Sequence, residues 1–464
     1  MGFQYQRLME QLITLMDSQK IVAHQQLPSI RELSAQYDVS LNTVKRCYSV
    51  LEAKGYVYAI YKSGYYAAAR KCADYPQLNP TAVTISRLDL LNEIHAAAAH
   101  KEHVPLGSVQ LSPALFPIEA IRRSLKRSAT YLKPENFLLA PKEGEPQLQQ
   151  ALSEHLAEDG IYSAARDIII TNGCTAALSA AISALSAMAD SIAVPVPAFN
   201  GHLQLLANMG RKVIEIPSNE YGIDLASLEE VMQLGIAKAC VLTANYQNPL
   251  AYCLSDEDKQ KVAELAARYQ FPIIEDDVYG ECGFLPKRPL PVKSWDTQGY
   301  VIWCGSTSKT LSRNFRVGWC VGGEGIAGFR AKFIALNSTV NTPLQLYLAD
   351  FIYSRAYRAY LSRLGSKLRQ QVHQYREKVL VIFADKCKSI TQPQGGYWLW
   401  IELPPGNDSV LLYQQAMQQQ INIVPGVVFG EQQDFSRYIR INAGVPLNPV
   451  IEQALQQLAD LIKV

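Results

Sequence analysis

Apolar residues recur at helical spacing through the first fifty residues of the chain, in three stripes that predict three short helices. Their inner positions are Leu8, Leu12, Leu15 and Met16 in the first, Ile30, Leu33 and Tyr37 in the second, and Val44, Tyr48 and Leu51 in the third. Ser29 can cap the second helix, with Glu32 completing a capping box, and Ser40 can cap the third after a turn of three residues. Two short helices joined in this way form a helix-turn-helix.

The segment after the third helix changes character. Residues 56–68 are rich in Tyr and Val and are broken at Ser63 and Gly64. This pattern predicts a two-stranded wing. Caps, turn and wing in this order are typical of a winged helix-turn-helix rather than of a plain helical domain with a solvated face.

Farther along, short apolar runs alternate with helical patterns. The runs that predict buried strands are residues 168–170, 191–194, 212–216, 239–242, 271–274 and 301–303. Such alternation indicates an α/β domain with a mainly parallel sheet and helices on its faces. Ligands bind these sheets beyond the carboxyl ends of the strands, so the residues that follow each run are the candidates for a binding site.

The pattern divides the 464 residues into a helix-turn-helix domain over residues 1–70, a linker over 71–85 and an α/β domain over 86–464. The formal charge of +2 is uneven along this division. Residues 1–71 hold nine Lys or Arg and five Asp or Glu, a net charge of +4, and the remainder has a net charge of −2. A basic first domain suits the phosphate backbone of DNA.

Several classes of protein are disfavoured. The nine cysteines are dispersed without a C-x-x-C pair, which favours reduced thiols and a cytoplasmic protein. No signal-like pattern opens the chain, and the longest small-apolar run, residues 174–189, is too short to span a membrane. The spacing of His95, His100 and His103 fits no standard metal motif, so we expect no metal site.

The third predicted helix carries the candidate DNA contacts. In a helix-turn-helix this helix enters the major groove with its N-terminal residues toward the base edges. Asn42 and Arg46 have donors and acceptors suited to base edges, and Thr43 and Lys45 suit phosphates. The first domain is therefore predicted to bind duplex DNA.

The most informative chemistry follows the last predicted strand, where Ser306, Ser308 and Lys309 are followed by Arg316. A lysine amine can hold an aldehyde cofactor as a Schiff base, or aldimine, while serine hydroxyls and an arginine fork hold a phosphate. These features predict pyridoxal 5'-phosphate (PLP), which carries both groups. A lone surface lysine is the alternative for Lys309, but the ordered set disfavours it.

The preceding strand supplies candidates for the cofactor ring. Asp276 could pair with a pyridine nitrogen and keep it protonated, and Tyr279 could donate to the ring oxygen. Asp277 is the rival for the first role, although the Asp-x-x-Tyr spacing favours Asp276.

Three earlier strands end at further candidates. Gly173, Cys174 and Thr175 open a helix, which is a phosphate cradle if it is more than an ordinary cap. Phe199 could stack on the ring or simply pack in its loop. Asn248 could bond a ring hydroxyl or be a turn asparagine before proline.

Near the C-terminus, Arg440 lies in an apolar run that predicts a strand. An arginine there could bind a substrate carboxylate or form a structural ion pair.

The first domain resembles the winged helix of GntR-family regulators. The residues that carry the resemblance are Leu27, Pro28, Ser29, Arg31 and Leu33, then Val39, Ser40, Thr43 and Val44, and finally Ser63 and Gly64. In that family the residues matching Arg31 and Lys45 contact DNA. An arginine is common where this chain has Leu41, so one expected contact is missing.

The rest of the chain resembles fold-type I PLP enzymes of the aspartate-aminotransferase class, which have a large domain and a small C-terminal α/β subdomain. The motifs in family order are Thr171-x-Gly173, Asn248-Pro249, Asp276-x-x-Tyr279, Ser306-x-Ser308-Lys309, Arg316-x-Gly318 and Arg440. The resemblance implies that Lys309 forms the Schiff base, Asp276 pairs with the pyridine and Arg316 binds phosphate. It also implies a carboxylate ligand in Arg440 and a homodimer. Together the two domains resemble the MocR-like subfamily of GntR regulators.

Two departures from the family pattern affect catalysis. The usual N-P-[ST]-G turn is Asn248-Pro249-Leu250-Ala251, and the aromatic phosphate ligand that the neighbouring subunit supplies is replaced by Leu139. Enzyme activity is therefore uncertain, and we expect slow or half-reaction transamination at most.

The leading hypothesis is a PLP-dependent transcriptional regulator that binds operator DNA and senses PLP itself, or a small amine or amino acid, through the aldimine at Lys309. The alternative is a catalytically active aminotransferase with a DNA-binding head. A DNA-binding protein with a cofactor-free scaffold is less favoured, because Lys309, Asp276 and Arg316 are all retained.

Overall fold

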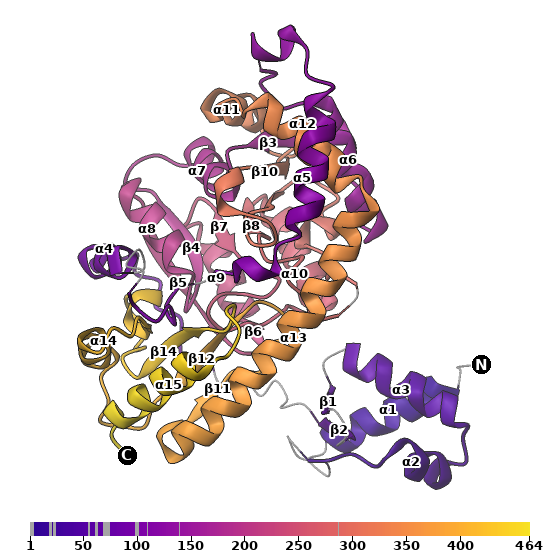
Figure 1. The fold of residues 1–464 in the computed structure, drawn as a ribbon, viewed down its shortest axis with the longest axis vertical. Helices are drawn as coiled ribbons and strands as arrows, with labels where there is room; N and C mark the ends of the chain where they lie inside the picture. Colours follow the sequence, from indigo (N-terminus) through magenta and orange to yellow (C-terminus); the bar gives the residue numbers. More distant parts are fainter. Residues whose placement is uncertain are drawn as a thin grey trace. The chain divides into compact units, whose positions relative to one another are not determined.

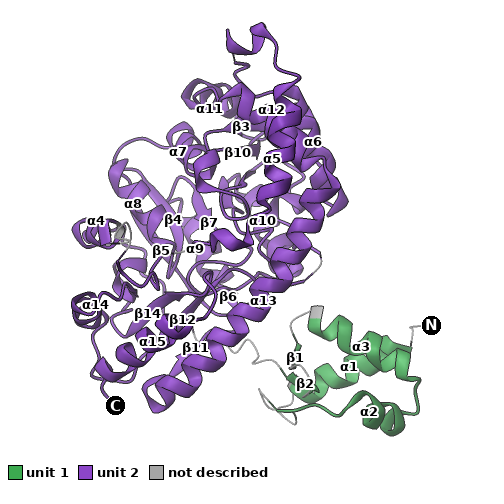
Figure 2. Cartoon of the chain, viewed as in Figure 1, with its two compact units in different colours: residues 1–74 green, residues 75–464 purple. Residues whose placement is uncertain are grey.

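The computed structural model describes residues 4–17, 21, 25–53, 56–60, 64–67, 75–97, 102–108, 110–138, 140–285 and 287–464. The chain forms two compact units, residues 1–74 and 75–464 (Figure 2). Leu139 and Ser63 lie outside the described residues. Within the described part, none of the helices combines the length and the apolar composition that a bilayer crossing demands.

The first unit is a small helical domain with a two-stranded wing. Its elements are α1 (Gln4–Asp17), α2 (Ile30–Tyr37), α3 (Leu41–Ala53), β1 (Val57–Ile60) and β2 (Gly64–Ala67). The predicted capping box is present: Ser29 Oγ accepts from the Glu32 N–H, and Glu32 Oε2 accepts from the Ser29 N–H at 2.7 Å. Ser40 Oγ accepts from the Thr43 N–H at 3.1 Å. Both predicted caps are therefore confirmed.

The three predicted stripes form the core of this unit. Its buried side chains are Leu8, Leu12, Met16, Leu27, Leu33, Val44, Cys47, Tyr48, Leu51, Val57 and Ala67. β1 and β2 pair in antiparallel register, and Gly64 at the start of β2 has φ +113°, a conformation that favours glycine. The wing therefore closes onto the same core as the three helices.

The second unit is built on a sheet of eight strands in the order β3-β10-β9-β8-β7-β4-β5-β6 (Figure 1). The strands are β3 (Ile169–Thr171), β4 (Ser191–Val196), β5 (Lys212–Asn219), β6 (Gly222–Ile223), β7 (Cys240–Leu242), β8 (Ile273–Asp276), β9 (Val301–Ser306) and β10 (Gly318–Gly322). The central strands are parallel, and β10 is antiparallel to both of its neighbours. Each predicted strand is present, and the mainly parallel sheet is confirmed.

Helices cover both faces of this sheet (Figure 1). They are α4 (Leu88–Ala97), α5 (Ile118–Ala129), α6 (Pro146–Glu158), α7 (Cys174–Leu185), α8 (Asn200–Asn208), α9 (Leu225–Leu234), α10 (Asp256–Tyr269), α11 (Phe329–Leu336) and α12 (Thr342–Ile352). The long helix α13 (Arg355–Phe383) runs from this layer toward a second, smaller sheet.

The smaller sheet forms the C-terminal subdomain. Its antiparallel strands, in the order β11-β12-β14-β13, are β11 (Ser389–Ile390), β12 (Trp398–Glu402), β14 (Tyr438–Asn442) and β13 (Val424–Pro425). The helices α14 (Ser409–Gln418) and α15 (Pro449–Leu461) complete it. One continuous hydrophobic core joins this subdomain to the large sheet, so the expected fold class is confirmed.

Part of the segment that the sequence pattern assigned to a linker packs on the large unit. Val83 and Val213 of β5 exchange backbone hydrogen bonds of 2.8 Å each. Ser86 donates through its N–H and its hydroxyl to the Glu431 carboxylate, at 2.9 and 2.8 Å. Arg87 donates to the carbonyl oxygens at positions 427 and 430. These contacts hold the segment against the loop that follows η7 (Gly426–Phe429).

Candidate functional site

Lys309 lies in the turn that follows β9, at the carboxyl ends of the parallel strands. Its Nζ is 5.0 Å from the centroid of the Tyr279 ring, which follows β8, and 5.9 Å from the centroid of the Phe199 ring, which follows β4. The fold thus gathers three predicted site residues around one amine, although 110 positions of sequence separate the outermost two.

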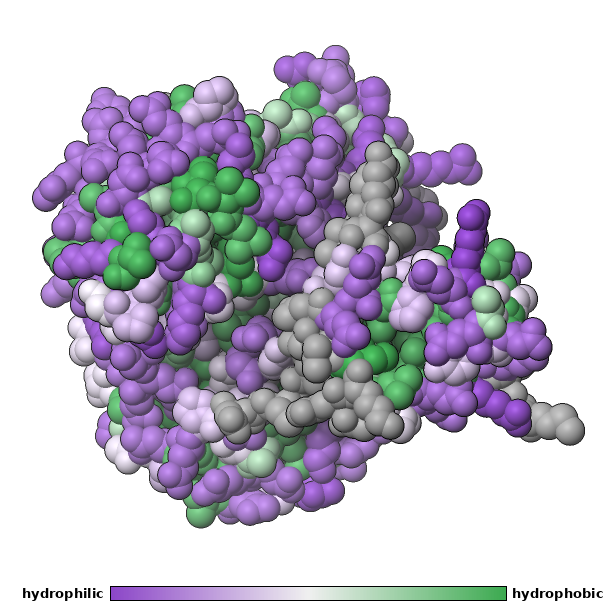
Figure 3. Space-filling model, turned by 90° about the horizontal axis from the view of Figure 1, so that it is seen from below, coloured by the Kyte–Doolittle hydropathy of each residue, from purple (hydrophilic) through white to green (hydrophobic). Residues whose placement is uncertain are grey.

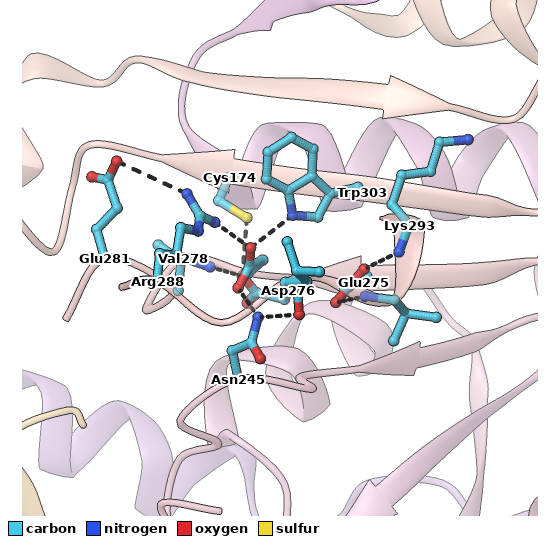
Figure 4. Close-up of polar contacts among 12 residues, drawn as sticks. Cys174, Asn245, Glu275, Asp276, Val278, Glu281, Arg288, Lys293 and Trp303 are labelled. Carbon is cyan, nitrogen blue, oxygen red and sulfur yellow. Dashed lines mark hydrogen bonds and ion pairs between the residues drawn. The ribbon is translucent and has the colours of Figure 1, made fainter. Parts of the chain in front are cut away.

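Asp276, the last residue of β8, is buried and accepts three hydrogen bonds (Figure 4). Cys174 Sγ donates at 3.1 Å, the Val278 N–H at 3.2 Å, and His202 Nε2 lies 2.7 Å from Oδ2. Burial by itself would raise the pKa of Asp276, but the hydrogen bond and the charge of His202 outweigh burial and lower it. The carboxylate is therefore held in its ionised form.

Asp277, the rival candidate, contacts a different cluster, whose members Arg288, Trp303 and Asn245 are labelled in Figure 4. It pairs with the Arg288 guanidinium and accepts from Trp303 Nε1 at 2.8 Å and Asn245 Nδ2 at 3.0 Å. Arg288 Nη1 also lies 3.9 Å from the Glu281 carboxylate. These partners satisfy Asp277 inside the protein, which leaves Asp276 as the carboxylate that faces the neighbourhood of Lys309.

The candidate phosphate cradle is the start of α7. Gly173 is the N-cap with φ +88°, and no side chain caps the helix. Arg316 Nη2 donates to the Asn172 carbonyl oxygen at 2.8 Å, and a Cβ placed on Gly173 would come within 3.2 Å of the guanidinium. The first N–H groups of a helix have no acceptor within it, so an uncapped start beside an arginine favours an anion.

The other predicted phosphate ligands differ in their placement. Ser306 and Ser308 lie with their hydroxyl oxygens 2.8 Å apart in the turn before Lys309. Thr175 is exposed on the first turn of α7. Cys174 is buried, and its thiol is bound to Asp276 rather than directed at the cradle.

Arg440 on β14 is buried beneath the same region. Its Nη1 donates to Asn248 Oδ1 at 3.0 Å, its Nη2 donates to the Gly107 carbonyl oxygen at 2.8 Å, and its Nε has no partner in the described part of the chain. Burial lowers the pKa of Arg440 to about 10. Asn248 Nδ2 in turn lies 3.5 Å from the Tyr279 hydroxyl. The Asn248 side chain thus joins Arg440 to Tyr279, and none of the described carboxylates pairs with the arginine.

A cavity of about 260 Å³ opens beside Lys309. Its walls come from the segment before α5, the turn after β9 and the start of the small sheet. The lining residues are Gln110, Leu111, Pro113, Phe116, Ser308, Lys309, Ser312, Arg313, Asn314 and Tyr397. Four of these residues are apolar or aromatic and six are polar or charged, so the cavity offers both an apolar surface and convergent polar groups, as ligand sites do.

Sequence reasoning missed three residues of this region. His202 follows a helix start with no recognisable motif, and only its contact with Asp276 reveals it. Arg313 and Tyr397 line the cavity, and tertiary packing determines which side of their segments faces it. An arginine four positions after Lys309 was the only signal available in the sequence.

The candidate DNA-contacting residues lie on the outer side of the first unit. Arg31, Asn42 and Lys45 are exposed. The Thr43 hydroxyl lies 2.8 Å from the Ser40 hydroxyl and belongs to the cap of α3. Arg46 is exposed, but its guanidinium packs 4.6 Å from the centroid of the Tyr5 ring on α1.

The described residues hold no cluster of three or more potential metal ligands. Among them, His103 is half-buried and Nδ1 contacts the Ala97 carbonyl oxygen at 3.4 Å.

Two family models match the chain. "Aminotransferase class I and II" matches residues 101–458, and "Bacterial regulatory proteins, gntR family" matches residues 4–66. The first match contains Lys309, Asp276, Arg316 and Arg440, and the second contains the capped helices and the wing.

Similar proteins share the whole arrangement. The uncharacterized HTH-type transcriptional regulator YdcR of Escherichia coli is 33% identical over 99% of both chains, and the regulator YjiR of the same organism is 31% identical over 94% of both. Among solved structures, the kynurenine aminotransferase of Pyrococcus horikoshii in complex with PMP is 26% identical. It covers 82% of this chain and 94% of its own, with a TM-score of 0.68.

The first testable prediction concerns His202. We expect His202→Leu to lower the free energy of unfolding of the second unit by about 1–3 kcal/mol at neutral pH, because a buried carboxylate loses its main donor. Because folding lowers the pKa of Asp276 below its ordinary value of 3.8, the ionised carboxylate stabilises the fold at any pH above 3.8. This stabilisation is lost as the pH falls through the pKa that Asp276 has in the folded protein. In the variant, burial dominates and the pKa rises. The loss should therefore be small near pH 3 and grow toward pH 7, as urea unfolding at several pH values would show.

His202→Gln, which keeps a side-chain donor, serves as the matched variant and should retain part of the stability. An equal loss in both variants with no dependence on pH would mean that His202 only fills space.

Proposed function

Since the chain belongs to the MocR-like GntR regulators, which join an HTH domain to an aminotransferase class I and II domain, we propose that it is a PLP-dependent transcriptional regulator. In this proposal the first unit binds operator DNA in the cytoplasm. The second unit senses PLP, or a small amine or amino acid, at Lys309. The observation that carries the proposal is the grouping of Lys309, Asp276 and Arg316 in a chain that also carries a winged helix.

The residues around Lys309 fit PLP. A carboxylate offers about four acceptor positions, and the three donors on Asp276 leave one for a protonated ring nitrogen. The uncapped start of α7 with the Arg316 guanidinium suits the phosphate. The aromatic rings of Phe199 and Tyr279 both lie within 6 Å of the amine, at 5.9 and 5.0 Å from Nζ to the ring centroids. The protein thus offers a carboxylate to the ring nitrogen, and helix N–H groups and a guanidinium to the phosphate.

Each residue would have a distinct role in holding the cofactor. Lys309 would attach it covalently through Nζ, and Asp276 would keep the ring nitrogen protonated. Gly173, Cys174 and Thr175 at the start of α7, together with Ser306, Ser308 and Arg316, would enclose the phosphate, while Phe199 would face the ring. PLP, when bound, supplies an electron sink for an amine substrate or effector.

Arg440 would take the carboxylate of the incoming compound. Its guanidinium is held by two neutral oxygens and no acid, so a carboxylate would be its first anionic partner. Asn248 and Tyr279, already in contact with each other, would orient toward the ring oxygen.

A route for the signal is visible within the second unit. Phe429 packs 5.3 Å from the Arg440 guanidinium, and its carbonyl oxygen accepts from the Ala198 N–H at 2.7 Å, next to Phe199. The Arg87 guanidinium binds the same loop at the carbonyl oxygens on either side of Phe429. A ligand that shifts Arg440 and Phe199 would therefore disturb the segment around Arg87, which lies near the beginning of the second unit.

We further propose a homodimer. Tyr131, Phe137 and Leu138 are 63%, 68% and 81% exposed on a segment that projects beyond α5 and α12 (Figure 1). Elsewhere, the face drawn in Figure 3 is mostly hydrophilic with separate apolar patches. Large exposed apolar side chains on a projecting segment suit burial against a second copy.

The alternative, an aminotransferase with a DNA-binding head, is favoured by the completeness of the site around Lys309. Rapid turnover with a panel of amino donors and keto acids, with no change in DNA affinity, would establish it. We propose slow or half-reaction transamination at most.

The second testable prediction is covalent attachment at Lys309. Protein mixed with PLP and then desalted should keep a visible absorbance band, and Lys309→Ala should lose it, because no other lysine lines this cavity in the described part of the chain. Lys367→Ala, which removes an exposed lysine of α13, is the control and should keep the band. An unchanged band in Lys309→Ala would refute the assignment.

The third testable prediction concerns DNA. After selection of a preferred site from random sequences, Asn42→Ala should cost about 1–3 kcal/mol at that site alone. Lys45→Ala should weaken all sequences alike and reduce the salt slope by about 1. Arg46→Ala should have a smaller effect on base preference, because Arg46 must leave Tyr5 to reach a base. Arg7→Ala on α1 is the control, and equal effects of all four substitutions would contradict this orientation.

The fourth testable prediction links the two activities. With a saturating effector from a panel of amines and amino acids, operator affinity should change by about 5- to 150-fold. In Arg87→Ala, the operator affinity should be nearly the same with and without the effector, while the cofactor absorbance stays intact. Arg330→Ala, which removes an arginine bound to Glu143 outside the site, should behave like the unsubstituted protein.

The unsubstituted protein and Arg87→Ala should both sediment as dimers under the same conditions. No effect of any amino compound or of PLP on operator affinity would refute the regulator. A full response in Arg87→Ala would refute only the route through the segment at Arg87.

A further inference from the structure

Arg313 is a cation in the cavity wall without an anionic partner. It lies in η5 (Arg313–Phe315), four residues after Lys309, and lines the cavity together with Lys309 and Tyr397. In the part of the chain that the structure describes, its guanidinium makes no hydrogen bond or ion pair. Arg313 is exposed, as arginines usually are, and its place in the wall of a cavity beside the Lys309 amine leaves its guanidinium available to an anionic ligand there.

The cavity contains no acidic side chain that could neutralise these cations. Its ten lining residues include Lys309 and Arg313 and no Asp or Glu. The other polar groups in the wall are Gln110, Ser308, Ser312, Asn314 and the Tyr397 hydroxyl. A wall of this composition attracts anions and disfavours cationic ligands.

Arg440 adds a second unpaired guanidinium next to the same space. The Gly107 carbonyl oxygen binds Arg440, and Gln110, three residues later, lines the cavity. The charge of Arg313 is close enough to lower the pKa of Arg440, after the larger effect of burial. Two guanidinium groups near enough to repel each other are stabilised when a ligand brings anionic groups to both of them.

We propose that the effector is an amino compound with two anionic groups, one bound by Arg440 and the other by Arg313. This inference rests on the proposed sensing function and specifies the class of ligand for the same site. The amine would face Lys309, the first carboxylate would reach Arg440, and the distal anion would lie against the exposed arginine of η5. Arg313 is thus the residue that determines specificity.

The distal anion is defined by its charge. A carboxylate and a phosphate both match a guanidinium fork in two parallel hydrogen bonds. The test therefore includes both kinds of compound, and their relative affinities identify the natural group.

Matched pairs of ligands isolate the second charge. Aspartate and asparagine, glutamate and glutamine, and phosphoserine and serine differ in the distal group and little in the rest. Each is titrated into the PLP-loaded protein and followed by the visible absorbance and by calorimetry. We expect at least one acid to bind roughly 10- to 100-fold more tightly than its neutral counterpart, the range typical of one charge-assisted hydrogen-bonded pair.

Substitutions at Arg313 test its part in this preference. Arg313→Gln should weaken the preferred acid by the same factor and leave its neutral counterpart within about threefold, while Arg313→Lys should restore part of the preference. Arg330→Gln on α11, outside the cavity, is the control and should match the unsubstituted protein.

Three outcomes would overturn the proposal. Equal affinity for every acid and its neutral counterpart would refute the proposal that the effector carries a second anionic group. A preference for acids that survives in Arg313→Gln would assign the distal group to another residue. Absence of any response to amino compounds would overturn the proposed sensing of amines and this inference together, whereas the first two outcomes leave the sensing function standing.

Discussion

Burial of three consecutive carboxyl groups at the end of β8 is the constraint around which the large unit is organised. Isolated buried charges are costly, so each must be neutralised or supplied with donors. Burial and the charge of Asp277 raise the pKa of Glu275 to about 8, and the N–H groups of Val292 and Lys293 donate to it. Burial and the neighbouring acid thus favour the neutral form of Glu275, and the two N–H groups act in the opposite direction.

The other two carboxyl groups are supplied with partners by different means. Asp277 has a full countercharge in Arg288, supported by Trp303 and Asn245. Among the described residues, the donors to Asp276 are His202, the Cys174 thiol and the Val278 N–H, the last two of which are labelled in Figure 4. Successive side chains of a strand face opposite ways, so adjacent acids can serve a structural cluster and an open site. Asp276 therefore keeps capacity for a ligand.

The same separation of roles applies to the cations. Arg288 forms an ion pair with Asp277. In contrast, Arg316 donates to a backbone carbonyl oxygen, Arg440 donates to the Asn248 amide oxygen, and Arg313 has no protein partner in the described chain. Excess positive charge gathers where the carboxyl ends of the strands, the start of α7 and the small sheet converge. That excess suits a phosphorylated cofactor and an anionic effector, and it is destabilising without them. Ligand binding and stability of the large unit are thus coupled.

Local patterns in the sequence determined the helix-turn-helix, the strands and the identity of the cofactor-binding motifs. Ser29 with Glu32, and Ser40 with Thr43, fix helix starts by contacts within four residues, so short-range patterns suffice. The order of Asp276, Ser306, Lys309 and Arg316 reflects strands and turns of fixed length, which is why the large domain was predictable. β10 was not predicted as a strand, because its residues were interpreted only as part of a motif.

Tertiary structure alone decided which groups meet. His202 faces Asp276, Arg313 enters the cavity beside Tyr397, and Arg46 packs on Tyr5, all through contacts between elements distant in sequence. Residues 71–85 were assigned to a linker from composition, yet Val83 pairs with Val213. Just beyond this segment, Arg87 is held by the carbonyl oxygens of a loop more than 300 residues away. Such contacts depend on the packing of whole elements against one another, which no local spacing of residues encodes.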